Sequence, residues 1–482
     1  MTKEEELQAL REENRSLKAL VAELLPLKEQ LAQANARIKE LEDRVAKDSR
    51  TSSKPPSSDG LGRLPRRSRR PSGKRPGGQA GHAGHTLAMV EPPDEVVCHR
   101  PEVCSQCRAD LSTVPGIVAE RRQVLDVPEI RLLAHEHRIE AICCPTCHTI
   151  SRGSFPLAVS APVQYGPNLQ ALAVYLHQGQ LLPTARTCET LAAICGCQIA
   201  EATLLQWSEL AAERLAPTVE RIAELIVASR LQHGDETGIR VYGMLHWLHV
   251  NCTRFLTHLA WHTSRGRPAM DEIGIWPRFG GRGMHDRLAS YDAYDCAHSI
   301  CGAHLVRDCA GVAQQEQQQW ATEMHDYLLD LHDACQQWRL LHLSAVPAIE
   351  RDEWVARYFE ILAAGYAAQP PPPVSSVGSR KGRPKQSKAK NLLDALMARA
   401  EQVLALLDDL RIPFTNNQAE RDLRLAKVQQ KISGTFRSAT GVTAFCRIRS
   451  YLSTMRKQGH SMLSALTAVF HGHPFPVAWS PE

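Results

Sequence analysis

Three acidic residues that are far apart in the sequence have the chemistry to bind metal ions together. Asp235 lies in His-Gly-Asp-Glu-Thr-Gly beside strand-like alternation, Asp286 lies at the expected end of another strand, and Glu420 opens a predicted helix. Hard divalent cations take oxygen ligands, and two magnesium ions can activate the attacking oxygen and stabilise the leaving oxygen in phosphoryl transfer. Without cations, adjacent carboxylates repel and raise one another's pKa. We therefore expect these acids to be catalytic ligands of two Mg²⁺ or Mn²⁺ ions.

The order of the acids along the chain indicates how they could meet. Strand-Asp, strand-Asp, helix-Glu suits an RNase H-like fold, in which neighbouring strand ends and one helix converge. A single Asp at a strand end is more often a cap or turn former, and four nearby acids remain alternatives: Glu236, Asp271, Asp292 and Asp295. The elements expected to position the site are strands over 239–252 and 254–262, a helix before residue 283, and helical sections over 305–370 and 392–470.

Three stretches of the chain are strongly basic. Nine Lys or Arg lie from Arg421 to Lys457 against one acid, Asp422, while residues 63–75 hold seven and residues 380–390 hold six, with no acid in either. Such patches favour a polyanion partner, most simply nucleic acid, although any one of them could be a solvated loop. The residues expected to bind DNA are Arg66, Arg67, Arg69, Arg70, Arg421, Arg424, Lys427, Lys431 and Arg437.

Two Cys-x-x-Cys pairs predict a structural zinc site. Strand-like alternation at 123–127 and 135–142, between the pairs, could form the short sheet that brings four thiolates together. Cys98 and Cys143 lie close enough to leave the ligand set open, and unrelated core cysteines are the alternative. A redox role is disfavoured because no thioredoxin-like pattern surrounds the pairs. The expected zinc ligands are Cys104, Cys107, Cys144 and Cys147.

The first 48 residues carry a heptad repeat. An apolar residue occupies every d position, whereas polar residues such as Asn14 and Asn35 occupy several a positions. This pattern is typical of a self-associating coiled coil in which polar a residues set register, although a helix packed on its own protein is the alternative. Pro26 should kink or divide the helix. The d positions are Leu10, Leu17, Leu24, Leu31, Ile38 and Val45.

The remaining patterns bound the class of protein. Residues 185–210 indicate a helix, a Gly-containing turn and a second helix from about Glu201, which is either a DNA-binding helix-turn-helix or part of a helical bundle. No apolar run approaches the ~20 residues of a membrane helix, and the acidic, polar start is unlike a secretory signal. We therefore expect a cytoplasmic protein.

The longer motifs resemble those of transposases of the insertion-sequence-66 family, part of the DDE transposase superfamily. The most specific is Pro413-Phe-Thr-Asn-Asn-Gln-Ala-Glu-Arg, and the paired Cys-x-x-Cys motifs resemble the family's zinc-binding region. The resemblance covers nearly the whole chain. The other similar segments are 52–59, 77–85, 165–172, 180–186 and 430–438.

The resemblance carries the family's catalytic acids onto the three acids above. The first Asp falls on Asp235, the second on Asp286, which Tyr291 follows by five residues as in the family pattern, and the Glu on Glu420. It implies a DNA transposase that uses water and then a DNA 3′ hydroxyl as nucleophile. The implied partners are terminal repeats, target DNA and accessory proteins of the same element, in the bacterial cytoplasm at the nucleoid.

A Cys-x-x-His motif of the family matches Cys301 and His304. We interpret this pair as supporting the fold, because its spacing is that of only one half of a zinc site. Two other functions remain as alternatives to the transposase: a non-catalytic zipper and zinc DNA-binding regulator, and a non-mobile nuclease of the same fold.

We expect a multidomain α+β protein with an RNase H-like core. The predicted parts are a coiled coil (1–48), a basic linker (49–90), a zinc module (91–160), a helical region (161–230), the first part of the core (231–305), a helical insertion with a basic linker (306–391), and the last part of the core with the catalytic Glu (392–482).

Overall fold

The computed structural model describes residues 3–46, 86–369 and 386–479. It divides into two compact units: residues 1–70, 161–188 and 199–482 form the first, and residues 71–160 and 189–198 the second. Nearly all of the predicted basic linker lies outside the described residues, together with Arg66, Arg67, Arg69 and Arg70. None of the described helices combines the length and apolarity that crossing a membrane requires.

The heptad segment forms one helix, α1 (Lys3–Ala46), which continues through Pro26. Of the two outcomes expected at Pro26, a kink or a division, the division does not occur. The d residues whose side chains are described are all more than half exposed: Leu17, Leu24, Leu31 and Ile38. A row of exposed apolar side chains along this 44-residue helix leaves apolar surface in water. Such a surface is what a coiled-coil partner would cover, so self-association stays a prediction.

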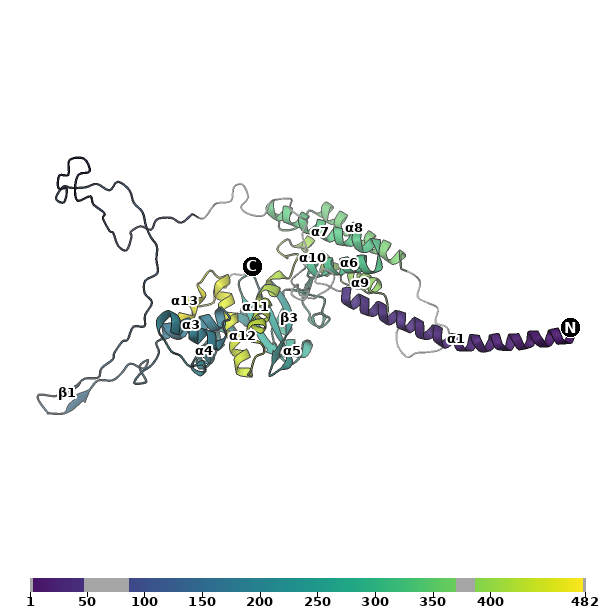
Figure 1. Ribbon diagram of the computed structural model, residues 1–482, viewed down its shortest axis with the longest axis horizontal. Coiled ribbons are helices and arrows are strands. Elements are labelled where there is room, and N and C mark those ends of the chain that lie inside the picture. The colour runs from purple at the N-terminus through teal and green to yellow at the C-terminus, as the bar shows by residue number, and fades with distance from the viewer. Residues whose placement is uncertain (1–2, 47–85, 370–385, 480–482) are drawn as a thin grey trace. The chain divides into compact units, whose positions relative to one another are not determined.

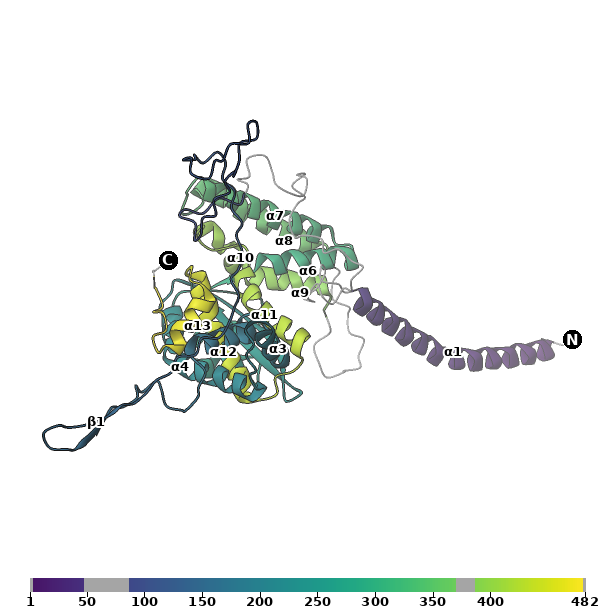
Figure 2. The same ribbon diagram turned by 60° about the vertical axis from the view of Figure 1, so that its left-hand side comes forward.

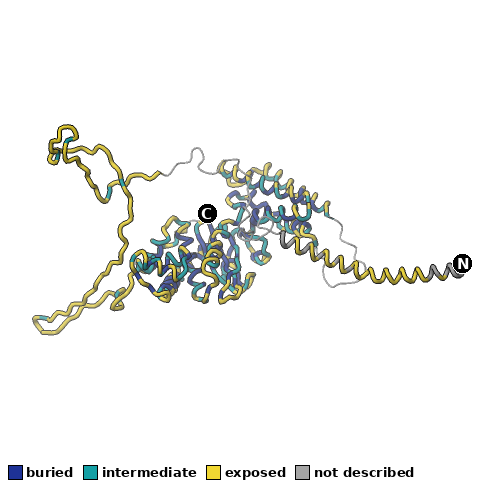
Figure 3. The backbone as a smooth tube through the Cα atoms, viewed as in Figure 1, coloured by how far each residue is buried: buried dark blue, intermediate teal, exposed yellow. Residues whose placement is uncertain are grey.

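The cysteine-rich segment has little secondary structure. Its strands β1 (Ala141–Cys143) and β2 (Ile150–Arg152) pair antiparallel around the second Cys-x-x-Cys motif. The strand predicted at 123–127 is absent, and that predicted at 135–142 shrinks to the start of β1. No residue from 86 to 160 is buried, as the yellow tube of this segment in Figure 3 shows. Alternation failed as a strand signal here because there is no apolar layer for one face to cover.

A five-stranded mixed sheet lies at the centre of the larger unit, with strand order β5-β4-β3-β6-β7 (Figure 1). The pairs β3–β4 and β4–β5 are antiparallel, whereas β3–β6 and β6–β7 are parallel. The strands are β3 (Leu231–Val241), β4 (Met244–Cys252), β5 (Thr257–His262), β6 (Arg282–His285) and β7 (Ala297–Ile300).

The strand predicted over 239–252 is wrong in one respect, because it is two strands joined by a tight turn. Tyr242 and Gly243 both have positive φ, 52° and 75°, as the two-residue turn of a hairpin requires. Glycine adopts this conformation freely, but tyrosine does so rarely, so the turn was hidden within an apparently continuous β pattern.

Helices surround this sheet, and the expected helical sections at 305–370 and 392–470 are confirmed. Helices α11 and α12 pack on β3, β4 and β5, and the buried residues of the sheet and these helices form one core cluster (Figure 2). Helices α6 to α10 form a second core beside Met284 and Ile300. The helices are α2 (Pro167–Val174), α3 (Thr184–Cys195), α4 (Glu201–Val227), α5 (Arg267–Ile273), α6 (Gly302–Glu316), α7 (Gln319–Leu340), α8 (Ala348–Ala367), α9 (Lys388–Ala398), α10 (Ala400–Asp408), α11 (Asn417–Ser433), α12 (Ala439–Lys457) and α13 (Met462–Phe470).

The second helix of the possible helix-turn-helix begins at Glu201, as expected. Helix α4 is 27 residues long and packs against α2, α12 and α13. Leu204 and Trp207 are buried, whereas Gln206 is exposed. The bundle interpretation therefore describes the buried face of α4, and only its outer face is available to a partner.

Candidate functional site

The register of the sheet brings two of the predicted acids together. Strands β3 and β6 run parallel, and His233 pairs with Met284. Asp235 and Asp286 each lie two residues further along, Asp235 within β3 and Asp286 directly after β6. Because successive residues of parallel strands stay in step, this register places the two aspartates side by side.

Two glycines allow an aromatic ring to lie against these strands. A Cβ at Gly234 would come within 2.5 Å of the Trp276 ring, and one at Gly283 within 2.4 Å. Trp276 is buried and also contacts Tyr291, with ring centroids 4.7 Å apart. Neither strand can therefore carry a side chain here, and Trp276 covers the backbone that immediately precedes Asp235.

A third carboxylate, Glu236, joins the two aspartates. One ligand oxygen from each of Asp235, Glu236 and Asp286 lies within 4.8 Å of the others. Burial, with the negative charges of Glu236, Asp286 and Glu420, raises the pKa of Asp235 well above its ordinary value. Three acids with so little separation are costly unless a cation compensates them.

Glu236 differs from its neighbours because two protein side chains already donate hydrogen bonds to it. Its side chain accepts hydrogen bonds from Tyr291 Oη at 2.8 Å and from Arg265 Nε at 2.8 Å. Arg265 Nη2 also lies 3.8 Å from Asp286 Oδ2. Glu236 is thus best placed to hold Arg265 and Tyr291 beside the aspartates. The sequence left it as an alternative ligand and gave no sign of these partners.

The other alternative acids have different surroundings. Asp271 accepts a hydrogen bond from Tyr294 Oη at 2.8 Å, and Asp292 pairs with Arg399. Neither belongs to the metal-compatible groups found among the described residues.

Glu420 lies in the first turn of α11 and belongs to a second group of possible metal ligands. One atom each of Cys301, His304 and Glu420 lies within 4.8 Å of the others. Glu420 Oε1 is 4.0 Å from His304 Nδ1 and 3.8 Å from Arg307 Nη2. Electrostatic effects link the two groups, because Glu420 contributes to the raised pKa of Asp235. The three predicted acids therefore converge on one region, with Glu420 beside rather than inside the tightest acidic cluster.

Asn416 fixes the start of α11 to the strand that carries Asp235. Its Nδ2 donates to Gly234 O at 2.8 Å, and its Oδ1 lies 2.9 Å from His233 Nδ1. Burial lowers the pKa of His233 to about 4, so this ring is neutral at neutral pH and its Nδ1–H can donate to Asn416. One buried amide thus connects the residue before Asp235 to the helix turn before Glu420.

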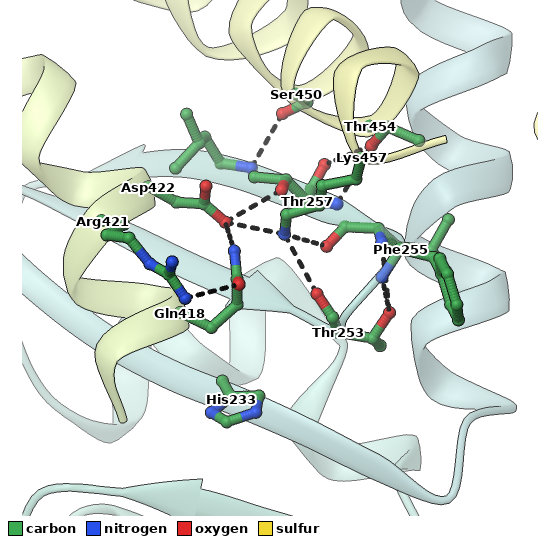
Figure 4. Close-up of polar contacts among 12 residues, drawn as sticks. His233, Thr253, Phe255, Thr257, Gln418, Arg421, Asp422, Ser450, Thr454 and Lys457 are labelled. Atoms are coloured by element: carbon green, nitrogen blue, oxygen red, sulfur yellow. Dashed lines mark hydrogen bonds and ion pairs between the residues drawn. The ribbon is translucent and has the colours of Figure 1, made fainter. Parts of the chain in front are cut away.

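A buried ion pair holds the next turn of α11, as Figure 4 shows. Asp422 Oδ2 accepts hydrogen bonds from Lys457 Nζ and Thr257 Oγ1, both at 2.9 Å. Lys457 also donates to the backbone oxygens of Thr253 and Leu256, at 3.0 and 2.8 Å. Strand β5, α11 and α12 therefore meet at Asp422, two residues after Glu420.

The basic residues of the C-terminal section divide into an exposed set and an internal set. Lys457 forms an ion pair with Asp422, and buried Arg449 donates to the backbone oxygen of Gly179 at 3.1 Å. These two cations bind protein groups rather than a partner. Lys427 is exposed but also donates to Gly238 O of β3 at 2.5 Å. The basic residues predicted to bind DNA are all exposed here: Arg421, Arg424, Lys427, Lys431 and Arg437.

Three exposed cations of α11 form one stripe that begins at Glu420. Glu420, Arg424, Lys427 and Lys431 follow one another at intervals of four, three and four residues, which places them on one helix face. Ala419, Leu423 and Ala426 of the same helix are buried in the core. A polyanion lying along the stripe would therefore reach Glu420.

The two Cys-x-x-Cys motifs adopt the same turn. At each, the first cysteine's N–H donates to the carbonyl five residues on, and its carbonyl accepts from the N–H four residues on, at 2.8 to 3.0 Å. The N–H groups of Cys107 and Gln106 lower the pKa of Cys104, and those of Cys147 and Thr146 lower the pKa of Cys144. Each turn thus favours the thiolate that zinc needs. The four thiols do not form one of the metal-compatible groups found among the described residues.

Comparison with known proteins gives a family for most of the chain. A family model described as the transposase IS66 family matches residues 162–444, more than half of the sequence. A second, described as a family of unknown function, DUF6444, matches residues 2–88. No curated protein matches the chain significantly.

Proposed function

The chain belongs to the transposase IS66 family, and we propose that it cleaves DNA strands at the ends of a mobile element and joins them to target DNA. The parallel register of β3 and β6, which sets Asp235 beside Asp286, is the observation that supports this most strongly. Glu420 of α11 is near enough to contribute to the raised pKa of Asp235. The strand order, with three antiparallel strands followed by two parallel ones, supports an RNase H-like core.

The acids fit a pair of hard cations. Oxygen ligands suit Mg²⁺ or Mn²⁺. Burial, and after it the neighbouring carboxylates, raise the pKa of Asp235, and a bound cation would offset both effects. Asp235, Asp286 and Glu420 would hold the ions. When bound, the ions would activate the attacking oxygen and stabilise the leaving oxygen.

The chain's own residues bind and orient the DNA. Arg424, Lys427 and Lys431 would contact backbone phosphates along α11, and Asn416 and Asp422 keep that helix in register with the strands. Water attacks a phosphodiester, the P–O3′ bond breaks, and the element end leaves with a 3′ hydroxyl. That hydroxyl then attacks a target phosphodiester, and a target 3′ oxygen leaves. No protein nucleophile is required.

The cysteine-rich segment supports a zinc module. It has two matching Cys-x-x-Cys turns and no buried residue among those described, and small domains without a core often depend on metal for folding. Zinc bound by Cys104, Cys107, Cys144 and Cys147 would hold the segment folded in place of a hydrophobic core. This module, with the basic linker, would contact terminal repeats.

The helix α1 would join two protein copies, so that both ends of an element are held together. Its exposed Leu17, Leu24 and Leu31 supply the apolar surface. Accessory proteins of the same element would be further partners, as the family resemblance implies.

A strand-joining assay separates the proposed function from its alternatives. Purified protein, Mg²⁺, a duplex carrying the element's terminal repeat and a supercoiled target plasmid are incubated together. A transposase yields joined products. Cleavage without joining would indicate a nuclease, and specific binding without cleavage would indicate a regulator; either result would overturn the proposal.

A further inference from the structure

The turn between β7 and α6 brings a thiol and an imidazole to the catalytic glutamate. Cys301 precedes the first residue of α6, His304 lies in its first turn, and Glu420 comes from α11. One possible ligand atom of each lies within 4.8 Å of the others. This donor set differs from the all-oxygen cluster of Asp235, Glu236 and Asp286, because it contains sulfur and nitrogen.

The Cys301 turn shares one feature with the two Cys-x-x-Cys motifs, which is backbone N–H groups directed at the cysteine sulfur. The backbone N–H groups of Ala303 and His304, two and three residues on, interact with the Cys301 sulfur, just as those of Gln106 and Cys107 interact with Cys104. Asn416 N adds a further hydrogen bond to Cys301 Sγ at 3.2 Å. Three amides aimed at one sulfur stabilise a thiolate. Burial has the larger, opposite effect and raises the pKa of Cys301 to about 11.

Two polar atoms in this group are buried and lack hydrogen-bond partners among the described residues. They are His304 Nδ1 and Glu420 Oε1, which lie 4.0 Å apart. Such atoms are rare in folded proteins. Arg307, 3.8 Å from the same Glu420 oxygen, does not meet the hydrogen-bond need of either atom.

The surrounding backbone holds the three ligands together. Gly302 N donates to Phe414 O at 2.8 Å, and a Cβ at Gly302 would come within 2.4 Å of the Phe414 ring. The segment that leads into α11 is therefore packed directly on the Cys301 turn. Any cation bound there would be held by elements that are already fixed to each other.

We propose that Cys301, His304 and Glu420 form a binding site for a thiophilic divalent ion of the zinc class. Thiolate and imidazole ligands select such ions over magnesium, and three protein ligands leave a coordination position open, as in catalytic rather than structural zinc sites. The ion shares Glu420 with the proposed magnesium site. Zinc bound here would therefore withdraw Glu420 from Mg²⁺ and inhibit DNA cleavage.

The test is the zinc content of the full-length protein. Wild type, His304→Gln and Cys301→Ser are equilibrated with buffered Zn²⁺, and metal per chain is measured by plasma mass spectrometry. Each variant should hold one zinc fewer than wild type, whatever the cysteine-rich segment binds, because that segment is unchanged. His325→Gln, which removes an exposed histidine beside Asp326, is the matched control and should keep the wild-type content.

Two further measurements keep the result decisive. His304 is partly exposed, so His304→Gln should fold as wild type by circular dichroism even if Cys301→Ser does not. Replacing zinc by Co²⁺ should give a thiolate-to-cobalt absorption that is weaker in Cys301→Ser. Equal zinc content in wild type and His304→Gln would overturn the proposal. The metal count does not depend on DNA cleavage. The zinc-site proposal can therefore fail while the transposase proposal stands, and the transposase proposal can fail while the zinc site is real.

Discussion

The ion pair between Asp422 and Lys457 should be one of the costliest polar contacts to break. Both side chains are nearly buried, 10% and 12% exposed, and their charged atoms are 2.9 Å apart. At an effective dielectric constant of ~20, opposite charges 4 Å apart attract by ~4 kcal/mol. Removing one partner of a buried pair costs ~3–5 kcal/mol, because the other charge remains buried.

Asp422→Asn keeps the size of the side chain but removes its charge. Lys457 retains its two backbone acceptors, Thr253 O and Leu256 O, so the expected loss of unfolding free energy is at the lower end of this range, about 3 kcal/mol. Urea denaturation monitored by circular dichroism measures this loss. DNA cleavage should fall with it, because Glu420 lies on the same helix two residues earlier.

Glu224→Gln is the matched control. Glu224 pairs with Arg221 at the same 2.9 Å, but the two side chains are 57% and 59% exposed, and exposed pairs contribute ~0–1 kcal/mol. The double variant Asp422→Asn with Lys457→Met should recover part of the loss, since no unpaired charge remains. A loss for Asp422→Asn no larger than that for Glu224→Gln would refute the reasoning.

Three other perturbations test separate parts of the site. Asn416→Ala leaves Gly234 O and His233 Nδ1 without their partner, so it should cost roughly 2–4 kcal/mol by urea denaturation and lower the cleavage rate, whereas an unchanged rate would separate Asn416 from the site. Asp235→Asn should raise the unfolding temperature in magnesium-free buffer at neutral pH. The pKa of Asp235 is higher in the folded protein than in the unfolded chain, so wild-type stability falls as the pH rises above the unfolded-state pKa. The difference in unfolding temperature between Asp235→Asn and wild type should therefore shrink on acidification. A difference that does not change with pH would contradict this prediction. Lys431→Ala should weaken DNA binding and reduce the salt slope by ~1, as titrations at several salt concentrations would measure, and an unchanged slope would remove Lys431 from the interface.

The sequence was enough to predict the acids of the site, but not the residues that surround them. Asp286 at a strand end and Glu420 at a helix start follow from local pattern, because strand and helix boundaries are local features. The proximity of Asp235 to Asp286 depends on pairing between strands about 50 residues apart, which no local pattern encodes. The family resemblance supplied that information instead.

The charge pattern alone could not separate exposed cations from internal ones. Lys457 and Arg449 have the same residue types as the exposed Arg424 and Lys431, and only tertiary packing makes them internal. Lys457 binds Asp422 of α11, whereas Arg449 binds the backbone of Gly179. Asn416 was part of the most specific motif, but its role depends on Gly234, 182 residues away in the sequence. Such contacts emerge only from the tertiary fold.

The central claim is that Asp235, Asp286 and Glu420 act as one metal-dependent cleavage site. Its most direct measurement is strand nicking of a supercoiled plasmid carrying the element's terminal repeat, in Mg²⁺, by wild type and by Asp235→Asn, Asp286→Asn and Glu420→Gln. We predict that each amide lowers the nicking rate at least ~100-fold, as loss of a key electrostatic group typically does, while the control Asp271→Asn stays near wild type. Wild-type nicking by any one of the three amide variants would contradict the account.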